Sequence, residues 1–87
     1  MPSIGQGQHL ATISHEGRFW DVYVELDDQQ TGPARGRLRF AAADQGRADS
    51  SVRTGFILVE ASPEAVYGRA RELSPHQLSA LLRSCLP

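Results

Sequence analysis

Hydrophobic and polar positions alternate strictly along residues 19–26, with the period of two that is typical of a half-buried β-strand. One face of this predicted strand carries only apolar residues: Trp20, Val22, Val24 and Leu26. The opposite face carries aromatic and acidic residues: Phe19, Asp21, Tyr23 and Glu25. We therefore expect the face that begins with Trp20 to pack against a hydrophobic core.

One further strand is predicted before this one in the sequence and one after it. Residues 9–14 form a weaker strand, and the turn at 15–18 contains Gly17, which can adopt a positive φ and close a hairpin. A third strand, at 36–43, points two sets of side chains in opposite directions: Leu38, Phe40 and Ala42 against Arg37, Arg39 and Ala41. The polar segments 27–35 and 44–53 are predicted to be loops, the second of them mobile.

A short apolar run at residues 56–59 predicts a fourth strand. The run follows Gly55 and precedes Ser62 and Pro63, and such boundaries favour a strand over a helix. In a regular strand, alternate residues would point to opposite faces: Phe56 and Leu58 to one, Ile57 and Val59 to the other. The pattern leaves open which of the two faces is covered.

Two short helices are predicted to close the chain. Ser62 is a suitable N-cap, and Pro63 follows at the first helical position. Ser74 and Gln77 have the spacing of a capping box. The apolar residues then recur at helical spacing, as Val66, Ala70 and Leu73 in the first helix and as Leu78, Leu81, Leu82, Cys85 and Leu86 in the second. Helices this short are marginal alone, so we expect their apolar stripes to lie on the sheet.

The order of these elements, β-β-β-β-α-α, determines the predicted fold class. Short loops favour antiparallel neighbours, and helices gathered on one face of an antiparallel sheet make a two-layer domain. We therefore predict an α+β fold, with a four-stranded antiparallel sheet and two C-terminal helices packed on one face. With 87 residues the chain has room for one domain, at 9–87, after a disordered N-terminal tail at 1–8.

Composition and charge narrow the classes of partner. The net charge is −1, whereas proteins that bind nucleic acid by neutralising phosphates are usually basic, so we expect no tight nucleic-acid binding. All nine basic residues are arginine, and lysine and asparagine are absent, a pattern typical of a G+C-rich bacterial genome. The single cysteine excludes an internal disulfide. No signal peptide or membrane span is indicated, so we expect a cytoplasmic protein.

Residues that could carry chemistry do not form a recognisable motif. His76 and Cys85 lie about 13 Å apart along a helix axis, too far for a base and its nucleophile. The three histidines, His9, His15 and His76, lack the spacing of a metal site. The loop carboxylates at 27–28 and 44–49 lack the spacing of a calcium-binding loop. We therefore predict no catalytic residue, metal or cofactor, and rank an enzyme below a binding protein.

The second face of the sheet is the main candidate for function. If the helices cover the Trp20 face, the other face shows Phe19, Tyr23, Arg37 and Arg39. Aromatic and arginine side chains on an open sheet can stack bases and hold phosphates. Asp21 and Glu25 share that face, however, and a cross-strand ladder of opposite charges explains the same residues without a ligand.

Two short helices can cover only one face of the sheet, so the apolar residues on the other face suggest an interaction surface. We define it as Phe19, Tyr23, Arg37, Arg39, Ile57 and Val59. Such a patch can reach a few hundred Å², the size at which patches on monomers become meaningful, unless a curled sheet, the N-terminal tail or a partner covers it. We predict a non-enzymatic protein-interaction module whose partner is itself or another protein, with a weak or moderate dimer through the open face or a strand edge. The alternative is single-stranded nucleic-acid binding through Phe19, Tyr23, Arg37 and Arg39.

Overall fold

The computed structural model describes residues 7–27, 32–43 and 51–86 of the chain. Five strands precede two helices: β1 (Gln8–His15), β2 (Arg18–Leu26), β3 (Ala34–Ala42), β4 (Val52–Arg53), β5 (Leu58–Glu60), α1 (Pro63–Arg71) and α2 (Pro75–Cys85). Most of the predicted N-terminal tail, and most of the predicted loops at 27–35 and 44–53, lie outside the described residues. Gln8, which was assigned to the tail, already belongs to β1.

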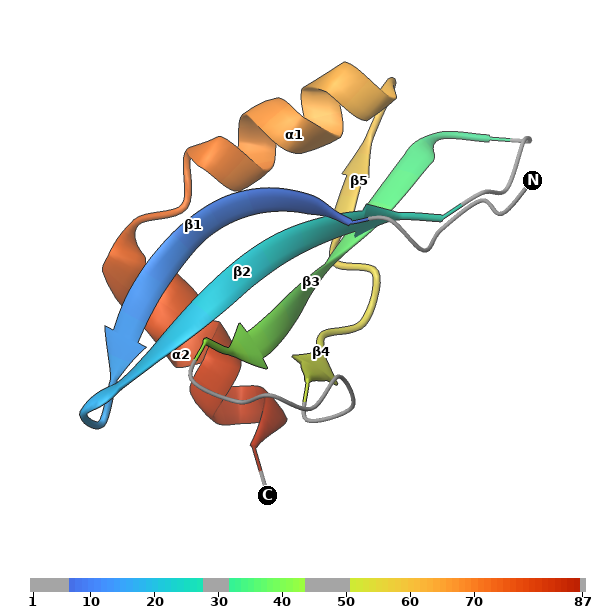
Figure 1. The fold of residues 1–87 in the computed structure, drawn as a ribbon. Helices are drawn as coiled ribbons and strands as arrows, with labels where there is room; N and C mark the ends of the chain where they lie inside the picture. Colours follow the sequence, from blue (N-terminus) through green and yellow to red (C-terminus); the bar gives the residue numbers. More distant parts are fainter. Residues whose placement is uncertain (1–6, 28–31, 44–50, 87) are drawn as a thin grey trace.

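The strands form one antiparallel sheet, and the predicted fold class is confirmed (Figure 1). β1, β2 and β3 follow one another as neighbours, and β4 and β5 both pair with the far side of β3. Both helices lie on one face of the sheet, which is strongly twisted. α1 contacts β5, β3 and β2, whereas α2 contacts β1 and β4, so the sheet curves around α2.

The fourth strand differs from its prediction, because it consists of two short pieces. β4 pairs with the middle of β3, and β5 pairs with its beginning. Between β4 and β5, Thr54 remains hydrogen-bonded to β3. Its N–H donates to the Leu38 carbonyl at 2.9 Å, and its Oγ1 accepts from the Leu38 N–H at 3.1 Å. The prediction that Phe56 and Leu58 share a face is wrong, because strict alternation requires a continuous strand. Leu58 is buried in the core, while Phe56 lies beside Arg37.

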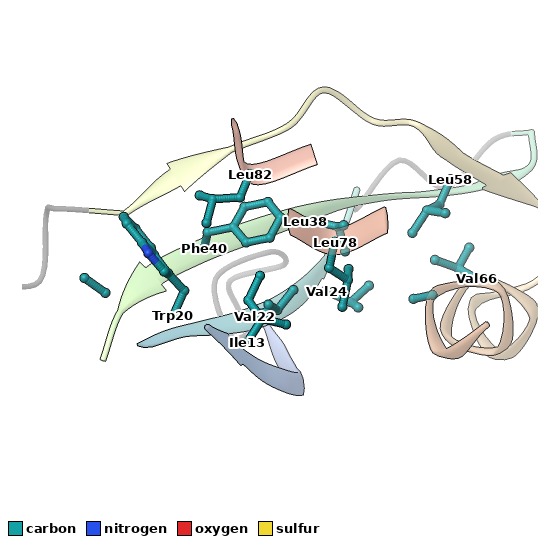
Figure 2. Packing of buried hydrophobic residues seen from close by; sticks show 12 residues of the cluster. Ile13, Trp20, Val22, Val24, Leu38, Phe40, Leu58, Val66, Leu78 and Leu82 are labelled. Atoms are coloured by element: carbon teal, nitrogen blue, oxygen red, sulfur yellow. The ribbon is translucent and has the colours of Figure 1, made fainter. Parts of the chain in front are cut away.

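The core lies between the sheet and the helices, and it uses the apolar stripes that the sequence predicts. Figure 2 shows its buried residues, which include Ile13, Trp20, Val22, Val24, Leu38, Phe40, Leu58, Val66, Leu78 and Leu82. Both predicted helix starts are also present. Ser62 accepts from the Ala65 N–H, and Ser74 and Gln77 form a complete capping box. None of the described helices has the length and apolar character needed to cross a membrane.

Two glycines are required for different reasons, Gly36 by close packing between the layers and Gly17 by the conformation of a turn. A Cβ atom on Gly36 of β3 would lie 2.6 Å from Val66 Cγ1, so only glycine lets α1 approach the sheet this closely. At the β1–β2 turn, Glu16 has φ 53° and Gly17 has φ 78°. Two positive φ values at the centre of a two-residue hairpin loop are the pattern of a type I′ turn, whose twist matches that of the strands. The predicted hairpin at 15–18 is therefore present.

Candidate functional site

The open face is the face of the sheet that the helices leave uncovered. In the register of β2 and β3, Tyr23 lies opposite Arg39 and Glu25 opposite Arg37. Arg53 of β4 lies opposite Arg39 on the other side. These positions alternate with core residues along their strands, so their side chains share the open face.

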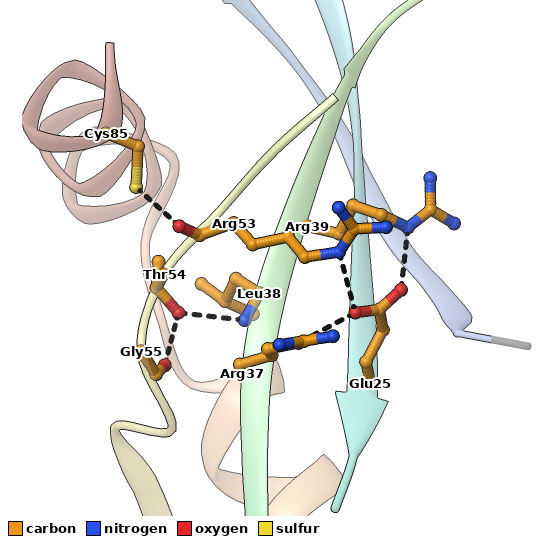
Figure 3. A network of polar contacts seen from close by, with 8 residues as sticks. All are labelled: Glu25, Arg37, Leu38, Arg39, Arg53, Thr54, Gly55 and Cys85. Carbon is orange, nitrogen blue, oxygen red and sulfur yellow. Dashed lines mark hydrogen bonds and ion pairs between the residues drawn. The ribbon is translucent and has the colours of Figure 1, made fainter. Parts of the chain in front are cut away.

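Three arginine side chains of the open face converge on Glu25 (Figure 3). The Nε atoms of Arg37 and Arg39 donate to different oxygens of the Glu25 carboxylate, each at 2.9 Å. The Nε of Arg53 donates to Oε1 at 3.2 Å. We term these four residues the arginine cluster. Glu25, which was expected to belong to a cross-strand ladder of opposite charges, is only 3% exposed.

Two aromatic rings support the guanidinium groups of the cluster. The guanidinium carbon of Arg39 lies 4.2 Å from the centroid of the Tyr23 ring, and that of Arg37 lies 4.9 Å from the Phe56 ring. Both distances are within the range of about 6 Å at which a cation is attracted to the face of a ring. The rings therefore hold the arginines in place, and the arginines in turn occupy ring faces that a nucleobase would need for stacking.

Gly7, at the start of the described chain, lies over the same part of the open face. A Cβ atom on Gly7 would lie 3.3 Å from Arg39 Nη2 and from Tyr23 Cβ, and 3.4 Å from Glu25 Cγ. Gly7 has φ +49°, a conformation that favours glycine. The backbone at Gly7 thus helps to cover Glu25, in agreement with the expectation that the N-terminal segment can cover part of this face.

The protonation state of Glu25 follows from this environment. Burial, the largest single influence, raises the pKa of the Glu25 carboxyl. The hydrogen bonds from Arg37 and Arg39 and the charges of Arg53 and Arg37 act in the opposite direction, and together they lower the pKa below its usual value. Glu25 is therefore a carboxylate at neutral pH, and the three arginines leave the cluster with two positive charges in excess.

A second polar group lies beside the cluster on β1 and β2. Thr12 Oγ1 donates to Asp21 Oδ1 at 2.7 Å, and His9 Nε2 lies 3.2 Å from the same oxygen. The hydrogen bond from Thr12 and the proximity of His9 lower the pKa of Asp21 against the opposing effect of burial. The His9 ring also meets the Tyr23 ring edge-on, with 5.3 Å between centroids, which links this group to the arginine cluster.

A hydroxyl, an imidazole and a carboxylate are the components of a nucleophilic triad, but their connections here are different. In a triad the hydroxyl donates to one histidine nitrogen and the carboxylate binds the other. Here Thr12 donates directly to Asp21, and both residues approach the same nitrogen of His9. The imidazole is therefore not placed to take the Thr12 proton, and the arrangement supports a structural role.

The structure brings together three of the six residues of the predicted interaction surface: Tyr23, Arg37 and Arg39. Phe19 is 62% exposed at the beginning of β2, where its carbonyl accepts from the Ala43 N–H. Val59 is half-exposed at the opposite end of the open face, since it pairs with Arg35. Ile57 is also half-exposed, but it lines a hollow with residues of the helical layer.

Sequence reasoning missed the central position of Glu25 and the contribution of Arg53. A signal for Glu25 was present, because it alternates with core residues on a strand next to one that carries Arg37 and Arg39. Arg53 gave no such signal, since it falls in a segment that was predicted to be a loop. Its place in the cluster depends on the pairing of a two-residue strand, β4, which no pattern in the sequence indicates.

Two hollows lie elsewhere on the described surface. One, of about 340 Å³, is lined by His15, Glu16, Arg18, Trp20 and Leu86, and the other, of about 380 Å³, is lined by Ile57, Leu73, Gln77, Ala80 and Leu81. Neither lining contains a hydroxyl or thiol nucleophile. Cys85 lies outside both, with its Sγ donating to the Arg53 carbonyl at 3.5 Å. Within the described residues, no cluster of three or more potential ligands could hold a metal ion.

Comparisons of the chain with protein-family models, with curated proteins and with solved structures find no match.

Proposed function

We propose that this protein is a non-enzymatic interaction module that pairs with a second copy of itself through the outer edge of β1. The observation that carries the proposal is the position of β1 in the sheet. It is an eight-residue strand at the end of the strand order, and β2 is its only neighbour among the described strands. The outer edge of such a strand presents backbone donors and acceptors to another chain.

The opposite edge of the sheet is a poorer template for pairing. It consists of β4, with two residues, and β5, with three. The segment between them leaves the strand conformation, and Thr54 uses both its N–H and its hydroxyl to bind Leu38. Short and interrupted edges are a common way in which proteins prevent edge pairing. β1 has one such device, an irregularity between His9 and Ala11, and it continues regularly from Ala11 to His15.

The edge of β1 is better supported than the open face as the contact between copies. The two large apolar residues exposed on the open face, Phe19 and Val59, lie beside Ala43, which follows β3, and Arg35 of β3. Eight residues of strand separate these positions by about 26 Å. The arginine cluster lies between Phe19 and Val59. The apolar residues therefore do not form one patch, and a contact made by backbone hydrogen bonds needs none.

A symmetric dimer follows from antiparallel pairing of β1 with the β1 strand of a second copy. Such pairing is two-fold symmetric, which is the commonest arrangement in homo-oligomers. It extends the sheet across the pair and keeps the two open faces on the same side. The regular part of β1 is short, and no apolar patch adjoins it on the open face, so we expect a weak or moderate affinity.

The experiment compares one lysine substitution at each edge of the sheet. Ser14→Lys introduces a charge on β1, and lysine on an edge strand opposes strand pairing. Val59→Lys places the same charge on β5. We expect the wild type and Val59→Lys to form dimers at millimolar concentration in sedimentation equilibrium, and Ser14→Lys to remain a monomer. A monomeric wild type contradicts the proposal. Dimers that only Val59→Lys disrupts would instead indicate the open face or the β5 edge.

Amide hydrogen exchange gives an independent measure of the same contact. Backbone amides of β1 that point away from β2 should exchange more slowly as the protein concentration rises. Amides of β4 and β5 on the opposite edge serve as the control and should show no such change.

The alternative functions have weaker support from the geometry. Base stacking by Tyr23 conflicts with the position of Arg39 over its ring, and Phe19 lies apart from the arginines. Catalysis lacks support because the Thr12, His9 and Asp21 side chains are not connected as a nucleophilic triad. We also propose a bacterial cytoplasmic location, supported by the arginine-only basic residues and the single cysteine.

A further inference from the structure

The arginine cluster holds more positive charge than its own carboxylate neutralises. Arg37, Arg39 and Arg53 all point their Nε atoms at one side chain, Glu25. The next acidic residue on β2, Asp21, is engaged by Thr12 and His9 instead. Like charges gathered in this way repel one another, and a second anion would relieve that repulsion.

We propose that the arginine cluster binds the dianionic form of a phosphate group, as inorganic phosphate or a phosphate monoester. A guanidinium group has five N–H donors in a planar fork, and the bonds to Glu25 each use the Nε–H. Figure 3 shows the terminal nitrogens of Arg39 directed away from the Glu25 carboxylate. Terminal N–H groups of arginine form paired bonds with phosphate oxygens. The excess of two positive charges matches a phosphate dianion.

The cluster is also ordered before a ligand arrives. Glu25 fixes the position of each arginine at Nε, and Tyr23 and Phe56 lie against the faces of Arg39 and Arg37. Binding to mobile arginine side chains costs conformational entropy, and prior ordering removes part of that cost. In this arrangement Glu25 is a positioning residue, which does not itself touch the ligand.

The arginines remain accessible from the open face. The side chain of Arg53 is 45% exposed, and those of Arg37 and Arg39 are partly exposed. Gly7 lies at one side of the cluster, where any larger side chain would meet Arg39.

The test is a titration of the full chain with inorganic phosphate, followed by NMR of the arginine Nε–H and backbone resonances. Chloride at matched ionic strength is the reference, because salt screens exposed charges. We expect saturable shifts at Arg37, Arg39 and Arg53 at millimolar phosphate at about pH 8, where inorganic phosphate is mostly the dianion. A phosphate monoester, whose second pKa is about 6, should give the same shifts already at neutral pH. We expect Arg53→Gln to weaken binding about tenfold, as for one lost charged hydrogen bond. Arg83→Gln, a matched change on α2, should bind as the wild type does.

Glu25→Gln separates a built site from simple charge attraction. Removing a negative charge makes the face more positive, so attraction alone predicts tighter phosphate binding. If Glu25 positions the arginines, the variant binds phosphate more weakly despite its added charge. Arg53→Gln, at the most exposed of the three arginines, keeps the proposal testable if Glu25→Gln does not fold.

Three results would overturn the proposal. The first is the absence of phosphate-specific shifts at the cluster, which would leave it a purely structural network. The second is equal weakening by Arg53→Gln and Arg83→Gln. The third is binding of a short oligothymidylate without binding of phosphate or a nucleoside monophosphate, which would indicate a single-stranded nucleic-acid surface instead.

Discussion

The two faces of the sheet bury side chains of opposite polarity. On the helical side, Val22 is fully buried among apolar neighbours, and its burial needs no particular partner atom. On the open side, Glu25 is 3% exposed, and its burial depends on three nitrogens within 3.2 Å. Phe19, an aromatic residue on the same strand as both, is 62% exposed.

Residue type and burial are separate properties in this protein. The helical side gains stability from apolar area that leaves water, which is non-directional and tolerates small shifts. The open side holds charges whose desolvation cost is recovered only in one geometry. We therefore expect the helical side to account for most of the stability, and the open side to fix the positions of particular side chains.

The largest expected effect distinguishes two phenylalanines on opposite faces. Phe40→Ala removes a fully buried ring and should lower the free energy of unfolding by about 3–5 kcal/mol. Phe19→Ala, the matched change on the open face, should alter it by less than about 0.5 kcal/mol. Urea unfolding of both variants measures the difference. A similar loss in both would mean that Phe19 is buried against a partner in solution.

Glu25→Gln tests the charged side of the comparison. The variant keeps the shape of the side chain but leaves three arginines without their carboxylate. We expect a loss of about 2–3 kcal/mol in unfolding free energy, somewhat less than the about 3–5 kcal/mol for a fully buried pair, because the arginines are partly exposed. Glu72→Gln, at an exposed position on the edge of α1, should have almost no effect.

The pH dependence of the unfolding free energy tests whether the effect of Glu25→Gln is ionic. Because the folded protein lowers the pKa of Glu25 below its usual value of 4.5, the carboxylate stabilises the fold at every pH above that value. The contribution is lost as pH falls through the folded pKa. The difference between wild type and Glu25→Gln should thus be constant near neutrality and shrink below about pH 4.5. A constant difference down to pH 2 would contradict the ionic origin of the effect.

Gly36→Ala tests how closely the two layers pack. The added Cβ would lie 2.6 Å from Val66 Cγ1, so the buried Val66 side chain or α1 has to shift, and we expect a loss of about 1–3 kcal/mol. Gly68→Ala, on α1 itself, is the matched control because no atom lies within 4 Å of the new Cβ. It should raise stability by about 0.5–1 kcal/mol, since alanine favours a helix. Thermal unfolding that shifts in the same direction for both would contradict this packing.

The smallest effect is expected at the rim of the arginine cluster. Arg53→Gln removes the most exposed of the three arginines, and partly exposed ion pairs contribute little. We expect a loss of less than about 1 kcal/mol in urea unfolding, well below that of Glu25→Gln. A loss as large as that of Glu25→Gln would mean that β4 depends on this contact for its pairing.

The helical side could be predicted from the sequence more completely than the open side. The alternation at 19–26 and the serine caps at 62 and 74 follow local rules, and the structure contains all of them. The arginine cluster depends on register between strands that are far apart in sequence, and on a break at Thr54 that makes Phe56 and Leu58 diverge. Local patterns contain no information about such pairings. The expected ladder of opposite charges is present at Glu25, which binds Arg37 and Arg39, whereas Asp21 binds Thr12 and His9 instead.

The position of both helices after the sheet has a consequence for biosynthesis. During synthesis β1, β2 and β3 leave the ribosome before α1 and α2, which cover their apolar side. During that interval Trp20, Leu38 and Phe40 have no cover, and the outer edge of β1 is exposed as well. Nascent chains with uncovered apolar surface and unpaired strand edges are prone to aggregate. We therefore expect a released chain that ends before Ser62 to bind chaperones, and a released chain that continues through α2 to escape them.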